Sequence, residues 1–279
     1  MTIRQVTEWA GLALTRPLVM GILNVTPDSF SDGGRYFDPD AAIMTGRQML
    51  ADGADILDIG GESTRPGAAP VSVADEIKRI LPVVQALAAE GAVVSLDTRN
   101  ANTMEAGLNA GARIINDVSA LTHDRDSLSL AATWNCPVIL MHMRGTPQTM
   151  NDHAAYQDVA AEVARDLANL CDMALAAGIK PGNICLDPGF GFAKRGNQNI
   201  VLLQALPRLL QLGYPVLTAL SRKRFLGEIS MEPDAARRDP ESLAAGLYAI
   251  TQGTHIIRAH DVAGTVRALR VWQRLTEEI

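Results

Sequence analysis

The segment VADEIKRILPVVQALAAEGAVVSLD, residues 73–97, carries the pattern that decides the predicted fold. The apolar spacing of residues 73–90 predicts a helix, and Gly91 follows it where a left-handed C-cap is wanted. Residues 92–97 then form a short, mostly apolar run that ends at Asp97. Such a run is typical of a parallel strand covered on both faces. The segment therefore predicts one helix–strand step of an α/β fold.

The same alternation recurs along the whole chain. We predict strands at residues 18–23, 55–59, 92–97, 113–116, 137–142, 183–187, 215–220 and 255–258. Helical stretches at 41–51, 73–90, 154–177 and 200–212 lie between them, and a glycine precedes the next strand at Gly53, Gly91, Gly111, Gly178 and Gly213. Eight units leave about 35 residues each, which favours a single-domain (β/α)8 TIM barrel at residues 17–279. Residues 1–16 are expected to be a short N-terminal extension across its bottom.

An open doubly wound sheet is the alternative architecture. It usually carries a G-x-G-x-x-G turn after its first strand, whereas residues 24–28 read NVTPD here. We see no low-complexity linker and no boundary of a second domain. The barrel is therefore the favoured fold.

Composition narrows the functional classes. The chain is 47% hydrophobic and 20% charged with a net charge of −6, which excludes wholesale disorder and makes a nucleic-acid partner unexpected. No apolar run is long enough for a membrane span, so no membrane association is expected. The three widely spaced cysteines are expected to be buried thiols. A cytoplasmic location is the interpretation that follows.

Polar residues recur where the predicted strands end. They are Asn24, Asp58 with Glu62, Asp97, Asn116, His142, Asp187, Ser221 with Lys223, and Arg258 with His260. A single Asp after a strand more often caps the next helix than takes part in chemistry. In a barrel, however, all strand ends meet at one face. Polarity in most units therefore predicts a lined cavity.

The residue types suggest a ligand with two parts. Arg65, Lys223, Arg258 and His260 together indicate a phosphate or diphosphate. Asp97, Asn116 and Asp187 need hydrogen-bond donors, which the edge of a flat aminopyrimidinone heterocycle supplies, with Lys223 donating to its carbonyl or ring nitrogen. A paired-carboxylate glycosidase is the competing hypothesis. It explains the acids but not the cations.

Two loops at this face are dense in turn-forming residues, 24–34 and 60–67, and are expected to close over substrate. The amide oxygen of Asn24 is a plausible single protein ligand for Mg²⁺. The sequence Met141-His142-Met143 is not interpreted as a metal site, because one face of that strand is expected to line the cavity wall.

Eight motifs in order give the chain a specific resemblance. It resembles the dihydropteroate synthases, folate-pathway enzymes of the pterin-binding barrel family, nearly from end to end. The motifs are NVTPDSFSDGG (24–34), GGESTRPG (60–67), SLDT (95–98), INDV (115–118), MHMRGTP (141–147), DPGFGF (187–192), SRK (221–223) and RAHDV (258–262). The first two are long and highly specific.

The resemblance implies condensation of 6-hydroxymethyl-7,8-dihydropterin diphosphate with 4-aminobenzoate, giving 7,8-dihydropteroate and diphosphate. It implies pterin contacts from Asp97, Asn116, Met141, Asp187, Lys223 and Arg258. Diphosphate and Mg²⁺ would be held by Asn24, Thr64, Arg258 and His260. The aminobenzoate site, where sulfonamides compete, would be formed by Arg65, Pro66, Phe192 and Ser221. The catalytic loops would contain Phe30, Asp32, Thr64 and Arg65, and a cytoplasmic homodimer is expected.

The chain departs from the family pattern at Leu96, Arg144, Ala193, Ala219 and Arg224, none of which is a proposed ligand. Two other functions on the same barrel remain as alternatives. One is methyltetrahydrofolate-dependent methyl transfer to a corrinoid, which has no use for a diphosphate clamp. The other is a non-catalytic pterin-binding paralogue. Diphosphate release that requires both 4-aminobenzoate and Mg²⁺ separates them from synthesis.

Overall fold

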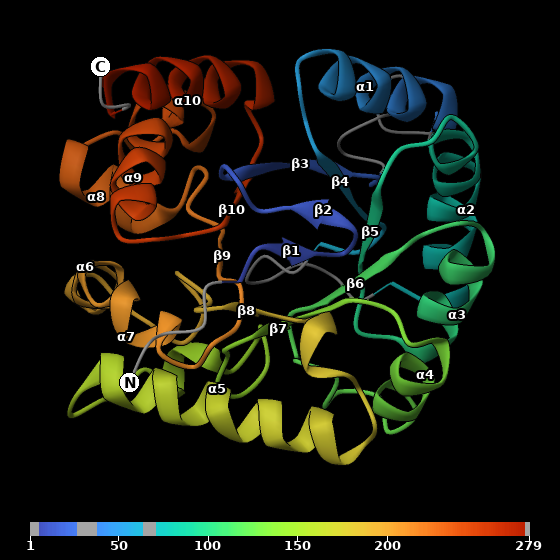
Figure 1. The fold of residues 1–279 in the computed structure, drawn as a ribbon, viewed down its shortest axis with the longest axis horizontal. Coiled ribbons are helices and arrows are strands. Elements are labelled where there is room, and N and C mark those ends of the chain that lie inside the picture. Colours follow the sequence, from blue (N-terminus) through green and yellow to red (C-terminus); the bar gives the residue numbers. More distant parts are fainter. Residues whose placement is uncertain (1–5, 27–37, 64–70, 277–279) are drawn as a thin grey trace.

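In the computed structural model, eight parallel strands form one sheet that curls into a barrel, and helices surround it (Figure 1). The structure describes residues 6–26, 38–63 and 71–276. Strand order in the sheet is β8-β7-β6-β5-β4-β3-β10-β9, and a parallel bridge between Leu186 and Val216 joins the two end strands. The strands are β3 (Leu18–Asn24), β4 (Ile56–Gly60), β5 (Val94–Asp97), β6 (Ile114–Asp117), β7 (Val138–Met141), β8 (Ile184–Asp187), β9 (Leu217–Thr218) and β10 (Ile256–Ala259). The predicted (β/α)8 barrel is confirmed.

Helices lie between these strands along the chain, as the alternation predicted. They are α1 (Pro39–Ala51), α2 (Val73–Ala89), α3 (Ala101–Asn109), α4 (Ser127–Trp134), α5 (Val159–Ala176), α6 (Asn197–Gln204), α7 (Leu206–Leu210), α8 (Arg224–Ser230), α9 (Asp239–Thr251) and α10 (Val262–Thr276). All five glycines expected to precede strands have positive φ, from +81° at Gly213 to +106° at Gly111.

Three predicted boundaries were wrong for identifiable reasons. The stretch 200–212 is split into α6 and α7, because Pro207 has no backbone N–H to continue the first helix. The stretch 154–177 becomes helical only at Val159, after Asp158 caps the N–H groups of residues 160 and 161. The strand at 215–220 is regular only at β9, since Pro215 cannot donate to the ladder.

A hairpin before the first barrel strand covers the bottom of the barrel. Strands β1 (Glu8–Trp9) and β2 (Leu12–Ala13) pair antiparallel, and they lie across the centre of the view in Figure 1. The Trp9 side chain is fully buried in one apolar cluster with Leu18, Met20 and Ile56, and its indole N–H donates to the carbonyl of Asn183. The amino end of the barrel is thereby filled with apolar side chains.

The interior of the barrel changes from apolar to polar along the strands. The lower layer contains Ile56, Ile114, Ile139, Cys185, Leu217 and Ile256. Because strand side chains alternate, the residue two positions later faces the same interior. Those residues are Asp58, Asn116, Met141, Asp187, Ala219 and Arg258. The polar layer therefore begins directly above the apolar one.

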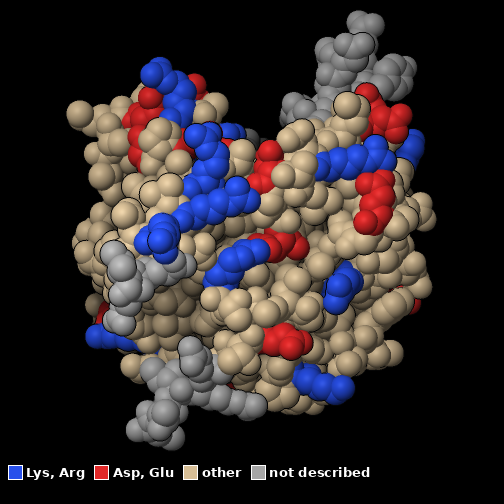
Figure 2. All heavy atoms as spheres, turned by 45° about the horizontal axis from the view of Figure 1, so that its top comes forward, with Lys and Arg blue, Asp and Glu red and all other residues tan. Residues whose placement is uncertain are grey.

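The outer surface and the thiols agree with an ordinary globular chain. On the face drawn in Figure 2, basic side chains lie among acidic ones, and most of the surface is uncharged. Cys136, Cys171 and Cys185 are buried free thiols, as predicted. Within the described ranges, no helix is both long enough and apolar enough to cross a bilayer.

Candidate active site

The carboxyl ends of the barrel strands bring the predicted pterin-binding residues to one mouth. Asp97 is the last residue of β5 and pairs in register with Asn116 of β6. Met141 ends β7 and pairs with Asp187, which ends β8. Residues 19 positions apart on β5 and β6, and 46 positions apart on β7 and β8, are therefore neighbours on adjacent strands. Asn24 ends β3 on the same face.

A buried network fills the floor of this mouth. The Arg258 Nε donates to Asp58 Oδ2 at 2.6 Å, and its Nη2 donates to Asp97 Oδ2 at 2.7 Å. The amide nitrogen of Asn116 also donates to Asp58 Oδ2, at 2.9 Å. Because a carboxylate only accepts, this contact fixes the Asn116 amide with its oxygen turned away from Asp58. That oxygen is left as an acceptor.

Burial shapes the electrostatics of this network. It raises the pKa of Asp97 to about 7, although the nearby Arg258 opposes the shift. Burial acts to lower the pKa of Arg258, but the carboxylates of Asp58 and Asp97 outweigh it and raise that pKa. The guanidinium is therefore charged at all ordinary pH values, while Asp97 titrates near neutrality.

Buried Asp187 and half-buried Lys223 form a second group. Burial raises the pKa of Asp187. The Gly189 N–H, which donates to Asp187 Oδ1 at 2.7 Å, and the Lys223 charge act to lower that pKa but do not outweigh burial. Burial likewise lowers the pKa of Lys223 to about 8. The Lys223 ammonium lies 4.4 Å from the centroid of the Phe192 ring, within range of a cation–π contact.

Ser221 and His260 are tied together at the rim. The Ser221 Oγ lies 2.9 Å from His260 Nδ1 and accepts the His260 backbone N–H at 3.1 Å. Asn24 is half-buried at the end of β3, and its side chain forms no hydrogen bond within the described part of the chain. The structure thus brings an amide, an imidazole and a guanidinium to the ends of β3 and β10.

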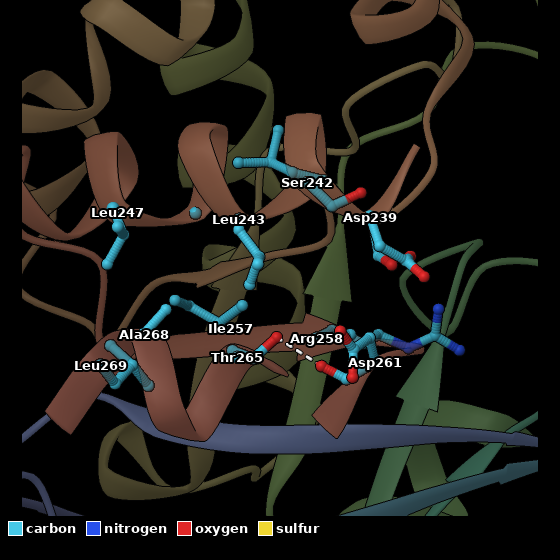
Figure 3. Close-up of a pocket in the computed structure, with 14 residues that line it drawn as sticks. Asp239, Ser242, Leu243, Leu247, Ile257, Arg258, Asp261, Thr265, Ala268 and Leu269 are labelled. Atoms are coloured by element: carbon cyan, nitrogen blue, oxygen red, sulfur yellow. Dashed lines mark hydrogen bonds between the residues drawn. The ribbon is translucent and has the colours of Figure 1, made fainter. Parts of the chain in front are cut away.

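A small cavity lies behind β10, outside the barrel interior. Its volume of about 20 Å³ matches a single water and cannot hold a substrate. Leu243, Leu247 and Ile257 line it, and the Arg258 side chain points away from this apolar lining (Figure 3). Arg258 therefore contributes to both the cavity lining and the floor network, but its guanidinium faces the network.

Sequence reasoning missed the structural role of Asp58. It was noted as a polar residue in a strand but was not named as a site residue, yet it holds both Arg258 and Asn116. Its position two residues after Ile56 was the available signal, because that spacing places it in the barrel interior. The predicted residues Phe30, Asp32, Thr64, Arg65 and Pro66 lie outside the described residues.

Comparison with known proteins decides the family. Residues 20–260 match the family described as pterin binding enzyme. A dihydropteroate synthase of Neisseria meningitidis serogroup C is 47% identical over 267 residues, covering 95% of this chain and 94% of that protein. The chain belongs to the dihydropteroate synthase family.

Solved structures of dihydropteroate synthases agree over nearly the whole chain. A Xanthomonas albilineans enzyme with 4-aminobenzoic acid superposes with a TM-score of 0.91 at 47% identity and covers 97% of each chain. The same organism's enzyme in complex with 7,8-dihydropteroate gives a TM-score of 0.87 at 44% identity, over 96% of this chain and 97% of that one.

Two departures from the dihydropteroate synthase pattern have a visible structural setting. The Arg144 guanidinium donates to Asp166 at 2.8 Å and to Glu162 at 3.1 Å on α5, and it lies over the Tyr156 ring. It therefore anchors the loop after β7. Ala219 packs against the apolar layer inside the barrel, at the level of the polar residues. Its methyl group therefore narrows the interior beside the residues predicted to bind the pterin.

Proposed function

We propose that the chain condenses 6-hydroxymethyl-7,8-dihydropterin diphosphate with 4-aminobenzoate and releases diphosphate, giving 7,8-dihydropteroate. The observation that carries this proposal is the convergence at one barrel mouth of buried Asn116 and Asp187 with half-buried Asp97 and Lys223. Membership of the dihydropteroate synthase family supports it, as do the aminobenzoate and dihydropteroate bound by the Xanthomonas enzymes.

The floor residues match the edge of a pterin in donors and acceptors. Asp97 and Asp187 accept from the ring N–H and amino groups, and the free oxygen of Asn116 accepts a further N–H. Lys223 donates to the ring carbonyl or nitrogen. When the pterin binds, its donors replace Arg258 Nη2 as the hydrogen-bond partner of Asp97. The released part of the guanidinium then faces the ring and the diphosphate, with Met141 on the ring's other side.

The reaction needs no protein nucleophile. The bond between the pterin methylene carbon and the diphosphate oxygen breaks, and the aryl amine forms the new C–N bond and then loses a proton. Arg258 and His260 bind the departing polyanion, together with Thr64, and the positive charge of Arg258 stabilises the negative charge that develops on it. Closure of the loops carrying Phe30, Asp32 and Arg65 keeps water from the electrophilic carbon.

The residues present fit a magnesium ion held largely by the substrate. The Asn24 side-chain oxygen is uncommitted at the end of β3. Within the described ranges, no group of three His, Cys, Asp or Glu side chains is arranged to hold a metal. In this proposal Asn24 would supply one amide oxygen to Mg²⁺, and diphosphate and water would supply the other ligands. When bound, the ion neutralises charge on the leaving group.

The aminobenzoate site extends from the pterin toward the loop after β8. Phe192 offers a ring face beside the Lys223 ammonium, and Ser221 offers a hydroxyl held by His260. Arg65 and Pro66 complete this site in the proposal. An aromatic carboxylate fits such a set, since one end is apolar and the other meets cations.

Two copies of the chain are proposed to pair through the face formed by α6, α8 and α9. A groove of about 330 Å³ lies there, lined by residues that include Ile200, Phe225 and Tyr248. Ile229 on its rim is 61% exposed and neighbouring Met231 is 87% exposed. Exposed apolar clusters of this kind mark association surfaces. A cytoplasmic homodimer is the resulting proposal, and the free buried thiols support a reducing compartment.

The direct test is release of diphosphate from the pterin substrate by the purified chain. Release is expected only when 4-aminobenzoate and Mg²⁺ are both present, with dihydropteroate forming in equal amount. Methyl transfer from methyltetrahydrofolate to a corrinoid, or tight pterin binding without turnover, would contradict the proposal in favour of the other two functions.

A further inference from the structure

Lys194 is a buried cation that the proposed reaction does not use. It follows the DPGFGF segment that leaves β8, and only 4% of its surface is exposed. Its Nζ donates to the carbonyls of Phe192 at 2.9 Å and Gly189 at 3.0 Å. It also donates to the carbonyl of His142 at 3.3 Å and lies 2.9 Å from that residue's Nδ1. Four acceptors thus surround a group with three protons.

These acceptors belong to the backbone that presents the substrate-facing side chains. Gly189 donates its N–H to Asp187, and Phe192 places its ring beside the Lys223 ammonium. Lys194 therefore binds the turn from Asp187 to Phe192 at its middle and at its far end. His142 adds a tie to β7, since its N–H donates to the Asp187 carbonyl at 2.9 Å.

The approach of the two chain segments is too close for any side chain at residue 189. A Cβ added to Gly189 would lie 2.0 Å from the His142 carbonyl oxygen. Gly189 has a φ of +68°, which favours glycine for a second reason. The turn is thus pressed against the end of β7, and the ammonium lies where the carbonyl oxygens converge.

His142 is fixed in one tautomer. Its Nε2 lies 3.2 Å from Asp166 Oδ2, an acceptor, so the ring proton is on Nε2 and the Nδ1 lone pair faces Lys194. Burial lowers the pKa of His142 to about 3, with the Lys194 charge adding to the effect. The ring is therefore neutral, and Lys194 is the member of this pair that carries charge.

We infer that Lys194 is a positioning residue whose buried ammonium fixes the turn after β8, so that Asp187 and Phe192 keep their places toward pterin and aminobenzoate. This inference rests on the proposed function, because it names what holds that same site. A neutral amine keeps only two donors for four acceptors, and its lone pair then faces an acceptor. Loss of the proton is expected to loosen the turn.

The proton on Lys194 is sensitive to pH in the neutral range. Burial lowers the pKa of Lys194 to about 7. The charged groups that face it are Asp187, Lys223, Arg144 and Asp166, of which the two carboxylates act to raise its pKa and the two cations act to lower it. Above this pKa the turn loses its charged anchor, so affinity for 4-aminobenzoate should fall as pH rises through about 7.

The test compares binding of 4-aminobenzoate in the presence of the pterin and diphosphate, measured by calorimetry from pH 6 to 9. Lys194→Met removes the donors, Lys194→Arg keeps a permanent charge, and Lys180→Met is a control at an exposed lysine at the bottom of the barrel. We expect binding about tenfold weaker in Lys194→Met at pH 6, with Lys180→Met unchanged. Lys194→Arg should lack the component of the pH profile near 7.

The outcomes separate this inference from the proposed function. A wild-type chain that binds neither ligand overturns the proposed function, whatever Lys194 does. A wild-type chain that binds, with identical affinity and pH profile in both Lys194 variants, overturns the positioning role alone. If circular dichroism shows that Lys194→Met does not fold, Lys194→Arg decides. A flattened profile then supports the role, and an unchanged one overturns it.

Discussion

The Arg258 side chain reaches across the barrel interior from β10 to β5, where its Nη2 donates to Asp97 Oδ2 at 2.7 Å. The carboxylate expected to receive the pterin is therefore already bound by a cation of the same chain. An unpaired buried carboxylate is costly, so this contact stabilises the ligand-free site. Binding becomes an exchange of donors at Asp97, which keeps the carboxylate paired before and after.

The titration of Asp97 gives the first prediction. Its pKa of about 7 lies above the ordinary value of 3.8, so the folded chain holds an extra proton between these limits. The contribution of this carboxyl to the unfolding free energy therefore falls as pH rises from about 4 to 7. The unfolding free energy measured with urea should decrease with pH over this range in the wild-type chain. It should decrease less steeply in Asp97→Asn. Equal slopes would show that Asp97 does not titrate there.

The same carboxyl predicts the pH dependence of pterin binding. Only the ionised form accepts donors at both oxygens, so affinity for the pterin should rise from pH 5.5 to 7.5. The increase should be absent in Asp97→Asn, whose affinity should also be lower by about tenfold or more. Calorimetry across this pH range measures both effects. An identical rise in the variant would assign the titration to another group.

Asp58 should be the more important residue for folding. Asp58→Asn weakens the contacts to Arg258 and Asn116 and leaves a buried guanidinium with one carboxylate, which is expected to cost about 3 kcal/mol of unfolding free energy. Glu90→Gln, which breaks the exposed ion pair with Arg47, is the control and should leave the urea midpoint unchanged. If both variants changed the unfolding free energy by a similarly small amount, Asp58 would not have the stabilising role given to it here.

Arg144 should contribute to stability rather than to chemistry. Arg144→Gln removes the contacts to Asp166 and Glu162, with an expected loss of about 1–2 kcal/mol in unfolding free energy. The kcat is expected to stay within about twofold, since these contacts anchor the loop from the α5 side. Parallel measurement of thermal unfolding and turnover tests this. A large fall in kcat with unchanged stability would place Arg144 in the reaction.

The pairing of two chains is tested at the rim of the apolar groove. Ile229→Glu should give a monomer in sedimentation equilibrium at concentrations where the wild-type chain is a dimer, because a carboxylate cannot be buried there without a partner. Val271→Glu on α10 is a matched control, since Val271 is 62% exposed and Ile229 is 61% exposed. Dissociation by the α10 variant alone would move the interface to that helix.

The sequence could predict the barrel because its signals are local and repeated. Apolar runs and helical spacing each indicate a strand or a helix from nearby residues alone. Glycines such as Gly91 and Gly111 have positive φ where a left-handed C-cap was expected. Boundaries failed where one residue overrode the pattern, as Pro207 did between α6 and α7.

The sequence could predict which residues gather at the candidate site, but not which of them contact each other. The strand-end rule placed Asp97, Asn116 and Asp187 at one mouth. Which side chain bonds to which depends on strand register and side-chain length across the interior, and no local pattern encodes this. Hence the Asp58–Arg258 pair and the four contacts of Lys194 emerged only from the structure.

The most direct test of the account is calorimetric binding of 6-hydroxymethyl-7,8-dihydropterin diphosphate to Asp187→Ala, Lys223→Ala and the control Lys180→Ala. Removing either pterin partner should weaken binding about a hundredfold, while the exposed control should match the wild-type chain. Wild-type affinity in both site variants would mean that these side chains do not hold the pterin.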